Sequence, residues 1–197
     1  LQMDRLGGVH SVAKRVRTAC EEEIKRYHST LAVVLEVFDR ARIDFLCIKS
    51  LAHFDFVRDD VDLLFKDRDR WKQAVNLLLS EGWSVAGIRD AQIHLHKPGF
   101  VELDCHWKVK WDAGGAAGIH CAMFDERGFW KRKRRVECGG LTVSIPCPED
   151  DVLILLAHAL FQHHYLTIGE LVHVGELVRS WPRFDFGHLV RETTPYG

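Results

Sequence analysis

Apolar residues recur at helical spacing in the first part of the chain. Between residues 11 and 42 they return every three or four positions, which is the repeat of one helix face. The series is Val12, Val16, Ala19, Cys20, Ile24, Tyr27, Leu31, Val34, Leu35 and Phe38. Ser11 is a suitable N-cap, because its hydroxyl can accept a hydrogen bond from a backbone N–H of the first turn. The pattern predicts one long helix over residues 11–42, or two helices with a break.

The middle of the chain carries short apolar runs that are typical of strands. They are residues 45–48, 61–65, 83–88, 93–97 and 100–109. Between the second and third runs, a helical pattern begins after Asp67 or Asp69 and ends at Gly82. Pro98-Gly99 separates the last two runs and indicates a hairpin turn. This part of the chain therefore predicts a β-sheet with one helix attached to it.

The last third of the chain changes from strands to helices. Residues 112–118 are rich in Gly and Ala and predict a linker or mobile loop, and residues 135–145 predict a second hairpin around Gly139-Gly140. Pro148-Glu149-Asp150-Asp151 is a favourable helix start, because proline suits the first turn and acids suit its positive end. Two helical patterns follow, at residues 152–165 and 166–181.

These patterns predict an α+β fold, with a mixed β-sheet flanked by helices and a C-terminal helical lobe. We expect four segments along the chain. They are an N-terminal helical segment (1–42), a sheet core (43–112), a linker with a β-hairpin (113–146) and the helical lobe (147–197).

Composition and charge restrict the function classes. The chain has 197 residues, of which 47% are hydrophobic and 28% charged, as in an ordinary globular protein. With a net charge of −1, no overall field attracts nucleic acid or a membrane. There is no apolar run of transmembrane length, and the N-terminus lacks the layout of a signal peptide. The six cysteines form no C-x-x-C pair, which favours reduced, buried thiols over disulfides or a Cys₄ zinc site. We therefore expect a cytoplasmic protein with no membrane partner.

The most informative polar feature is a pair of aspartates where the second strand begins. Side chains alternate along a strand, so Asp60 and Asp62 point to one face. A register shifted by one residue would replace Asp60 with Asp59, whose partner would then be unable to bind metal. Two neighbouring anions in a core strand need solvent or a cation, and Mg²⁺ prefers one or two carboxylates together with substrate phosphates. The pair therefore predicts metal-assisted chemistry on a phosphorylated substrate. The residues of the opposite, apolar face are Val61, Leu63 and Phe65.

A later strand offers a third carboxylate. Alternation places Glu102, Asp104 and His106 on one face of residues 100–109, opposite an apolar face. Either acid is a candidate to complete a metal site with the earlier pair.

The order of these features along the chain is informative as a set. The segments are Ile48-Lys49-Ser50, Asp60-Val61-Asp62-Leu63-Leu64, Asp104-Cys105-His106-Trp107, Pro148-Glu149-Asp150 and Leu155-Leu156-Ala157-His158. This order resembles the polymerase-β-like nucleotidyltransferase superfamily, in which a Gly-Ser turn, an Asp-x-Asp pair and a third carboxylate follow one another. Within the superfamily, the chain is most similar to an uncharacterised (type 5-like) nucleotidyltransferase family, over residues 43–181.

The resemblance implies a nucleotidyltransferase palm at residues 43–112 and an enzymatic activity. Such an enzyme moves a nucleoside monophosphate from a nucleoside triphosphate such as ATP to a hydroxyl of RNA, protein or a small molecule. Two Mg²⁺ ions would be held by Asp60, Asp62 and Asp104, the three catalytic residues. The resemblance also favours Asp104 over Glu102 as the third carboxylate. The residues that would contact the nucleotide are Lys49, Ser50 and Arg58.

Three features leave other functions open. The turn Lys49-Ser50-Leu51-Ala52 lacks the glycine that lets backbone N–H groups approach a phosphate, which favours a non-catalytic, antitoxin-like binding module of the same fold. His94, His96 and His106 alternate on strands that can be adjacent, which allows a zinc site. The basic run Lys131-Arg132-Lys133-Arg134-Arg135 is either a solvated edge or a phosphate-contacting patch for an RNA acceptor.

Overall fold

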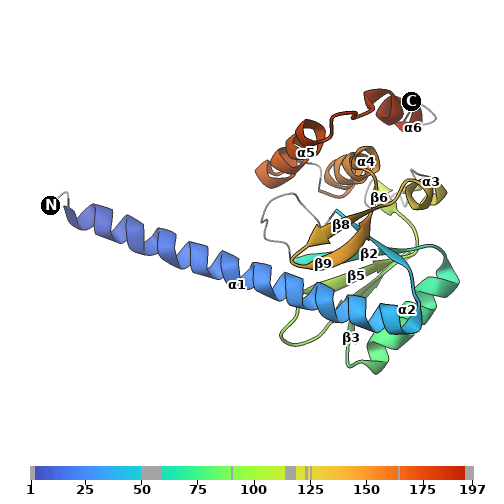
Figure 1. Cartoon of the computed structure of the whole chain (residues 1–197), viewed down its shortest axis with the longest axis horizontal. Helices are drawn as coiled ribbons and strands as arrows, with labels where there is room; N and C mark the ends of the chain where they lie inside the picture. Colours follow the sequence, from blue (N-terminus) through green and yellow to red (C-terminus); the bar gives the residue numbers. More distant parts are fainter. Residues whose placement is uncertain are drawn as a thin grey trace.

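The computed structural model describes residues 3–49, 59–89, 91–113, 119–122, 124, 126–163 and 165–193. Ser50 and Arg58, two of the expected nucleotide contacts, lie outside the described residues. Figure 1 shows the chain as a long N-terminal helix, a central sheet and a group of C-terminal helices.

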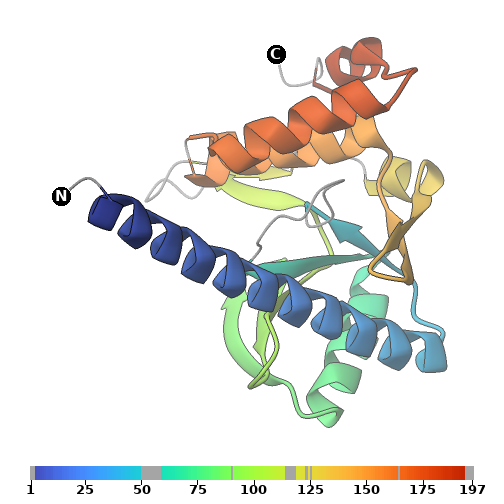
Figure 2. The ribbon, with the colours of Figure 1, turned by 60° about the vertical axis from the view of Figure 1, so that its left-hand side comes forward.

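The N-terminal helix is a single element, α1 (Met3–Ala41), longer than predicted and without a break. Its second half buries one stripe on the sheet, including Leu31, Val34 and Phe38. Its first half extends away from the rest of the molecule in both views (Figures 1 and 2), and Val12 and Val16 there are 50% and 57% exposed. The helical repeat therefore continues for several turns beyond the surface that it packs against.

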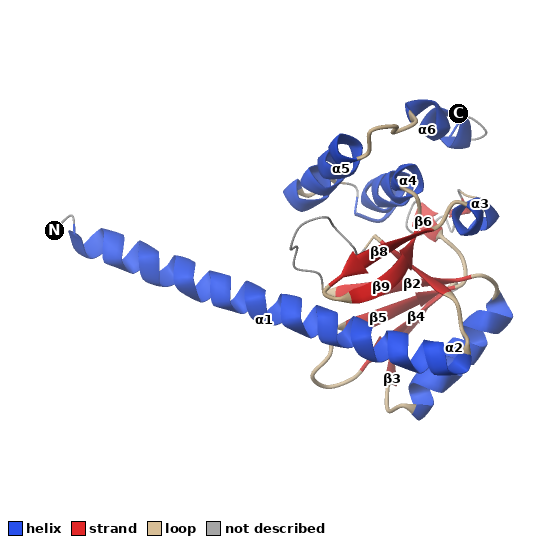
Figure 3. Cartoon of the chain, viewed as in Figure 1, coloured by secondary structure: helices blue, strands red, loops and turns tan. Residues whose placement is uncertain are grey.

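The central sheet is mixed and has five strands in the order β1-β2-β5-β4-β3. Its strands are β1 (Phe45–Ile48), β2 (Asp60–Phe65), β3 (Ser84–Arg89), β4 (Gln92–His96) and β5 (Glu102–His106). Strands β2 and β5 are parallel, and the other neighbouring pairs are antiparallel. Helix α2 (Arg68–Ser80), capped by Asp67, makes the connection from β2 towards the other edge. The predicted α+β class with a mixed sheet is confirmed (Figure 3).

The two faces of the sheet have different covers. Val61, Leu63 and Phe65 of β2 pack with α1 and α2, as the alternation predicts. Leu64 points to the other face, where it packs with residues of the C-terminal helices such as Ile154. Burying each large apolar side chain of this kind stabilises the fold by roughly 1.5–3 kcal/mol. Because Asp62 has the same parity as Leu64, the strand directs the aspartates to the face that the C-terminal helices border.

Two hairpins flank the sheet. In the first, β8 (Arg134–Cys138) pairs with β9 (Leu141–Ile145), and Gly139 and Gly140 form the turn with φ of 58° and 79°. Positive φ at both turn residues is the geometry that matches strand twist, and glycine adopts it readily. The second pairs β6 (Lys110–Ala113) with β7 (Ile119–Ala122).

The second hairpin corrects two sequence expectations. The predicted strand over residues 100–109 is shorter in the structure: β5 covers Glu102–His106, and the chain bends at residues 107–108 before β6 begins. The predicted linker over residues 112–118 begins inside β6, since Asp112 pairs with His120 in the ladder. Residues 114–118 lie outside the described part.

The C-terminal helices are α3 (Glu126–Lys131), α4 (Pro148–His158), α5 (Ile168–Ser180) and α6 (Phe186–Thr193), with a π-helical turn at Ala159–His163. Pro148 opens α4 as predicted, and a capping box between Thr167 and Glu170 opens α5. Helices α3 and α6 were not expected from the sequence. No helix in the described ranges combines the length and the apolar character that crossing a membrane requires.

Candidate active site

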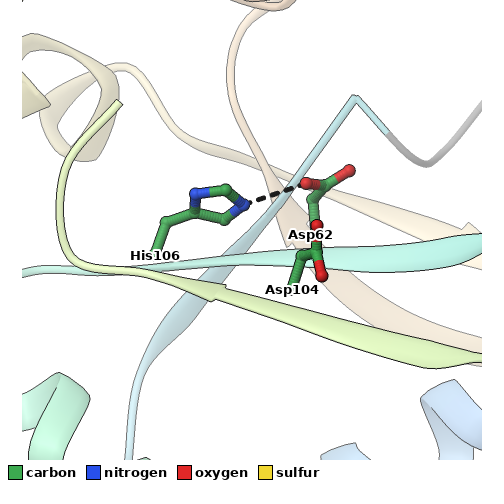
Figure 4. A group of neighbouring side chains, drawn as sticks. All are labelled: Asp62, Asp104 and His106. Carbon is green, nitrogen blue, oxygen red and sulfur yellow. Dashed lines mark hydrogen bonds and ion pairs between the residues drawn. The ribbon is translucent and has the colours of Figure 1, made fainter. Parts of the chain in front are cut away.

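The register between β2 and β5 decides which acids meet. Asp62 lies opposite Asp104, and Asp60 lies opposite Glu102, on two parallel neighbouring strands. Glu102 is exposed, whereas Asp62 and Asp104 are buried, with 3% and 6% of their surfaces exposed. The register therefore pairs Asp104, rather than Glu102, with Asp62. Figure 4 shows these two carboxylates beside each other, with the His106 ring next to them.

Four side chains form what we call the strand cluster: Lys49, Asp62, Asp104 and His106. Potential ligand atoms of Asp62, Asp104 and His106 lie within 4.8 Å of one another. Lys49 Nζ lies 2.8 Å from Asp62 Oδ1. His106 Nε2 lies 3.0 Å from the same oxygen, the contact dashed in Figure 4. All four residues are buried. The cluster therefore places two carboxylates, one ammonium and one imidazole in a small volume beneath the molecular surface.

The two carboxylates have opposite pKa shifts. Burial alone raises the pKa of Asp62, but the Lys49 ammonium and the hydrogen bond from His106 outweigh burial and hold the pKa well below its ordinary value. The pKa of Asp104 is raised, first by burial and then by the neighbouring charge of Asp62. Asp62 is thus firmly anionic, and the charged form of Asp104 is disfavoured until a further cation approaches.

Strand β4 fixes the orientation of Asp104. His94 Nδ1 lies 2.5 Å from Asp104 Oδ1, and Gln92 Nε2 donates to Asp104 Oδ2 at 2.6 Å. His94 keeps 21% of its side chain exposed, so this edge of the cluster is reached by solvent. Both oxygens of Asp104 are therefore held in place by side chains from one neighbouring strand.

The strand cluster fits a magnesium ion. Its adjacent carboxylate oxygens are hard ligands, and an excess of negative charge on two buried acids is what a divalent cation relieves. Asp60, at the half-exposed start of β2 on the same face, lies outside the group formed by Asp62, Asp104 and His106. In the part of the chain that the structure describes, this is the one group of at least three potential metal ligands.

The alternative zinc site is not formed. His94 pairs with Asp104, whereas His96 is half exposed and lies 3.8 Å from Glu102. The three histidines proposed for zinc do not form a ligand group among the described residues. Only His106 joins the metal-capable cluster, and it does so with two carboxylates.

Lys49, directly after β1, has a left-handed backbone conformation. Its φ is 57°, the left-handed region that glycine favours and a lysine enters at a cost of about 1–3 kcal/mol. The backbone N–H of Lys49 donates to Asp151 Oδ1 of α4 at 3.3 Å, and the side chain pairs with Asp62. Two contacts to buried acids therefore stabilise the strained backbone.

A second set of charges joins the C-terminal elements, and we call it the lobe cluster: Arg132, Asp150 and His188. Arg132 donates two hydrogen bonds to the fully buried Asp150, at 3.0 and 2.8 Å, and His188 Nε2 lies 2.8 Å from Asp150 Oδ1. The acids at the start of α4 thus bind side chains and backbone of the lobe rather than only facing the helix dipole.

Part of the basic run pairs with other residues of this chain. Besides Arg132, Lys133 pairs with Asp44 at 3.2 Å. Arg134 donates to the carbonyl of Pro146, and its guanidinium lies 5.0 Å from the centre of the Trp181 ring. Three of the five consecutive cations therefore have partners in the chain itself, which weakens the interpretation of this run as an RNA patch.

Sequence reasoning missed three members of the site. Alternation places His106 on the face of Asp104, but the sequence offers it only as a zinc ligand and not as a partner of Asp62. Gln92 carries no signal in the sequence, since its role depends on the pairing of β4 with β5. Asp151 was interpreted as a helix-start acid, whereas it also accepts the Lys49 N–H.

Comparisons with known proteins agree with this geometry. The sequence family described as "Uncharacterised nucleotidyltransferase" matches residues 8–197. No curated protein sequence matches the chain.

Solved structures with a similar fold include a lincosamide antibiotic adenylyltransferase and ANT(2")-Ia. The lincosamide antibiotic adenylyltransferase LnuA, in its lincomycin-bound form, is 13% identical with a TM-score of 0.54, covering 76% of this chain and 95% of its own. ANT(2")-Ia in complex with adenylyl-2"-tobramycin is 13% identical with a TM-score of 0.58, covering 85% of this chain and 94% of its own. At these identities the similarity establishes the fold.

Proposed function

We propose that this chain, which belongs to the uncharacterised nucleotidyltransferase family, transfers a nucleoside monophosphate to a hydroxyl group with the help of Mg²⁺. The observation that carries the proposal is the pairing of Asp62 with Asp104 on adjacent parallel strands, both buried and oriented by their neighbours. Two acids so placed, with a cation already against one of them, fit a site that handles a polyphosphate and its counterions.

The metal would be held by Asp62 and Asp104, with Asp60 as a further ligand once the substrate is present. When bound, Mg²⁺ would offset the charge of the triphosphate and lower the pKa of the attacking hydroxyl. The sequence resemblance leads us to propose two such ions, with Asp60, Asp62 and Asp104 as the acids that would hold them.

The residues of the chain then have separate tasks. Lys49 and His106 keep Asp62 anionic and oriented, and His94 and Gln92 hold both oxygens of Asp104. The acceptor oxygen forms a bond to the α-phosphorus, while the bond from that phosphorus to the bridging oxygen breaks and pyrophosphate leaves. Asp104, with its raised pKa, is suited to accept the hydroxyl proton.

A small hydroxyl compound is the acceptor class that we propose. One similar structure is a lincosamide antibiotic adenylyltransferase with bound lincomycin, and the other is ANT(2")-Ia in complex with adenylyl-2"-tobramycin. An RNA acceptor has less support, because Arg132, Lys133 and Arg134 are engaged within the chain. Lys49, Ser50 and Arg58 remain our proposed nucleotide contacts, with ATP as the first nucleotide to test, and the cytoplasm remains the expected location.

The non-catalytic alternative is favoured by the missing glycine, and the rest of that turn lies outside the described residues. Against it, both acids of the buried pair are present and held in orientation.

The test is a transfer assay. Each nucleoside triphosphate, labelled in the α-phosphate, is incubated with Mg²⁺ and the protein in the presence of aminoglycosides, lincosamides, sugars, RNA or protein extract. We expect label in a small-molecule fraction and release of pyrophosphate, both abolished in Asp62→Asn. Asp44→Asn is the matched control, because Asp44 is an exposed acid paired only at the surface with Lys133. Equal transfer by the wild type and Asp62→Asn would overturn the proposal.

A further inference from the structure

The ammonium of Lys49 forms an ion pair with Asp62, a proposed metal ligand. Lys49 Nζ lies 2.8 Å from Asp62 Oδ1, and the exposed fractions of the two side chains are only 9% and 4%. Buried lysines normally pair with an acid, because an isolated ammonium is strongly disfavoured away from water. Asp62 therefore already has a cation at one of its two carboxylate oxygens.

The backbone of Lys49 is fixed more firmly than its side chain. Its position is set by the end of β1, by the φ of 57° and by the hydrogen bond to Asp151 of α4. The side chain beyond Cβ is a flexible chain of methylenes that carries a point charge. The ammonium can thus move to another anion while the backbone stays in place.

The charges of the site show which anion would attract it. Asp62 and Asp104 provide two carboxylates, and Lys49 neutralises one of them. A divalent cation added alone would face the ammonium across a few ångströms of low-dielectric protein, where like charges repel strongly. A triphosphate arriving with the cation adds negative charge, so that both cations then have an anionic partner.

We propose that Lys49 is a built-in counterion that occupies Asp62 in the free protein and moves to the phosphates of the nucleotide when metal and nucleotide bind together. The inference rests on the proposed function, because it needs Asp62 as a metal ligand. Its consequence is coupling: nucleotide strengthens metal binding, and metal strengthens nucleotide binding by the same factor.

The coupling is measured with Mn²⁺ in place of Mg²⁺. The free Mn²⁺ signal in electron paramagnetic resonance gives the affinity, with and without a non-hydrolysable ATP analogue. For the wild type, we expect weak Mn²⁺ binding alone and an increase of about tenfold or more with the nucleotide, within the usual range of coupling between sites. For Lys49→Met, we expect Mn²⁺ alone to bind about tenfold more tightly than to the wild type, while the effect of the nucleotide shrinks.

Two further variants make the result decisive. Lys49→Gly removes the ammonium at a φ that suits glycine, so it should fold and should behave like Lys49→Met. Lys66→Met removes an exposed lysine immediately after β2 and should leave both affinities unchanged. Thermal unfolding of each variant reports whether the fold is intact.

The outcomes separate this inference from the proposed function. If folded Lys49→Met and Lys49→Gly bind Mn²⁺ alone no more tightly than the wild type, Lys49 is a fixed structural partner of Asp62 and the inference is wrong. The proposed function would survive that result, provided that Asp62→Asn still weakens Mn²⁺ binding in the presence of nucleotide. If the wild type binds no Mn²⁺ at any nucleotide concentration, the proposed metal site itself is refuted, and the inference with it.

Discussion

The strand cluster and the lobe cluster both bury aspartates beside cations, yet their charges are balanced differently. In the lobe cluster, Asp150 receives two hydrogen bonds from one guanidinium and a third contact from His188. In the strand cluster, two carboxylates lie side by side on β2 and β5, and the one ammonium of the cluster pairs with Asp62. The single acid of the lobe cluster, with all its hydrogen-bond partners in place, fits a structural role. The pair of acids in the strand cluster, with one ammonium for two carboxylates, fits a cation-binding role.

The locations of the clusters match these roles. The lobe cluster joins the end of α3, the start of α4 and helix α6, so its contacts hold separate helices together. The strand cluster lies on strands that the sheet already positions through backbone hydrogen bonds. Its side chains are therefore not needed to bring its elements together, and this difference leads to opposite predictions for mutation.

The largest expected effect is on transfer by Asp104→Asn. The amide keeps the size of the side chain and an acceptor for its neighbours, but it loses the charge that binds metal and the base that accepts a proton. Losing several kcal/mol of transition-state stabilisation corresponds to about a thousandfold lower rate. The free energy of unfolding should change by less than about 1 kcal/mol, because the raised pKa shows that the fold disfavours the charged form. Rates and urea unfolding measured on one preparation check both parts.

Asp150→Asn is the reciprocal variant for that comparison. We expect it to lower the free energy of unfolding while the transfer rate per folded molecule stays near that of the wild type. A thousandfold loss of rate in Asp150→Asn, with Asp104→Asn unaffected, would reverse the assignment of the two clusters.

The next largest effect is on stability in Arg132→Met. Removing the guanidinium leaves the fully buried Asp150 with a charge that has lost its main partner. Breaking one side of a buried pair costs about 3–5 kcal/mol, and we take the lower end because Arg132 is 37% exposed. The control Lys133→Met breaks an exposed pair with Asp44 and should cost at most about 1 kcal/mol. Urea unfolding separates the two, and equal losses would show that Asp150 does not depend on Arg132.

The sequence predicts those features of the fold and the site that depend on neighbouring residues, but not those that depend on contacts between distant segments. Strand alternation put Asp60 and Asp62 on one face correctly, because that parity is local. Alternation does not distinguish Glu102 from Asp104, since both lie on one face. Only the register between β2 and β5 determines which of them lies opposite Asp62. The choice of Asp104 came from family resemblance, and the register agrees with it.

The basic run likewise shows that long-range pairing cannot be predicted from local sequence. Five consecutive cations at residues 131–135 are visible in the sequence, but their partners are far along the chain: Asp150 for Arg132 and Asp44 for Lys133. A charge run therefore indicates an external partner only after internal ones are excluded. The conformation of Lys49 was likewise hidden, because the acids that hold it come from β2 and α4.

A smaller effect should appear in the pH dependence of stability. The pKa of Asp62 is lower in the folded protein, so its stabilisation is present above its ordinary pKa and is lost as the pH falls through the folded value. The pKa of Asp104 is raised, so its charged form costs stability above the folded value, and acidification relieves that cost. Near about pH 7, Asp62→Asn should thus be less stable than the wild type and Asp104→Asn equal or more stable. The Asp104→Asn difference should narrow as the pH falls towards about 4, whereas the Asp62→Asn difference should narrow only below about pH 4, as urea midpoints would show. If both variants were less stable than the wild type near about pH 7, the opposite pKa shifts of Asp62 and Asp104 would be contradicted.

The smallest effect is a local change in thiol reactivity that reports on each cluster separately. Cys47 and Cys105 are fully buried in β1 and β5, next to the strand cluster, and burial raises the pKa of both thiols. Cys147 lies beside the lobe cluster, where burial and the nearby Asp150 raise its pKa to about 12. Thiolate is the reactive form, so all three should react slowly with an alkylating agent in the folded protein. In Arg132→Met, looser packing around Asp150 should speed the labelling of Cys147 several-fold and leave Cys47 and Cys105 protected, as peptide-resolved mass spectrometry can measure. Faster labelling of all three together would mean that the two clusters unfold as one unit, and their separation into a structural and a functional set would then lack support from stability.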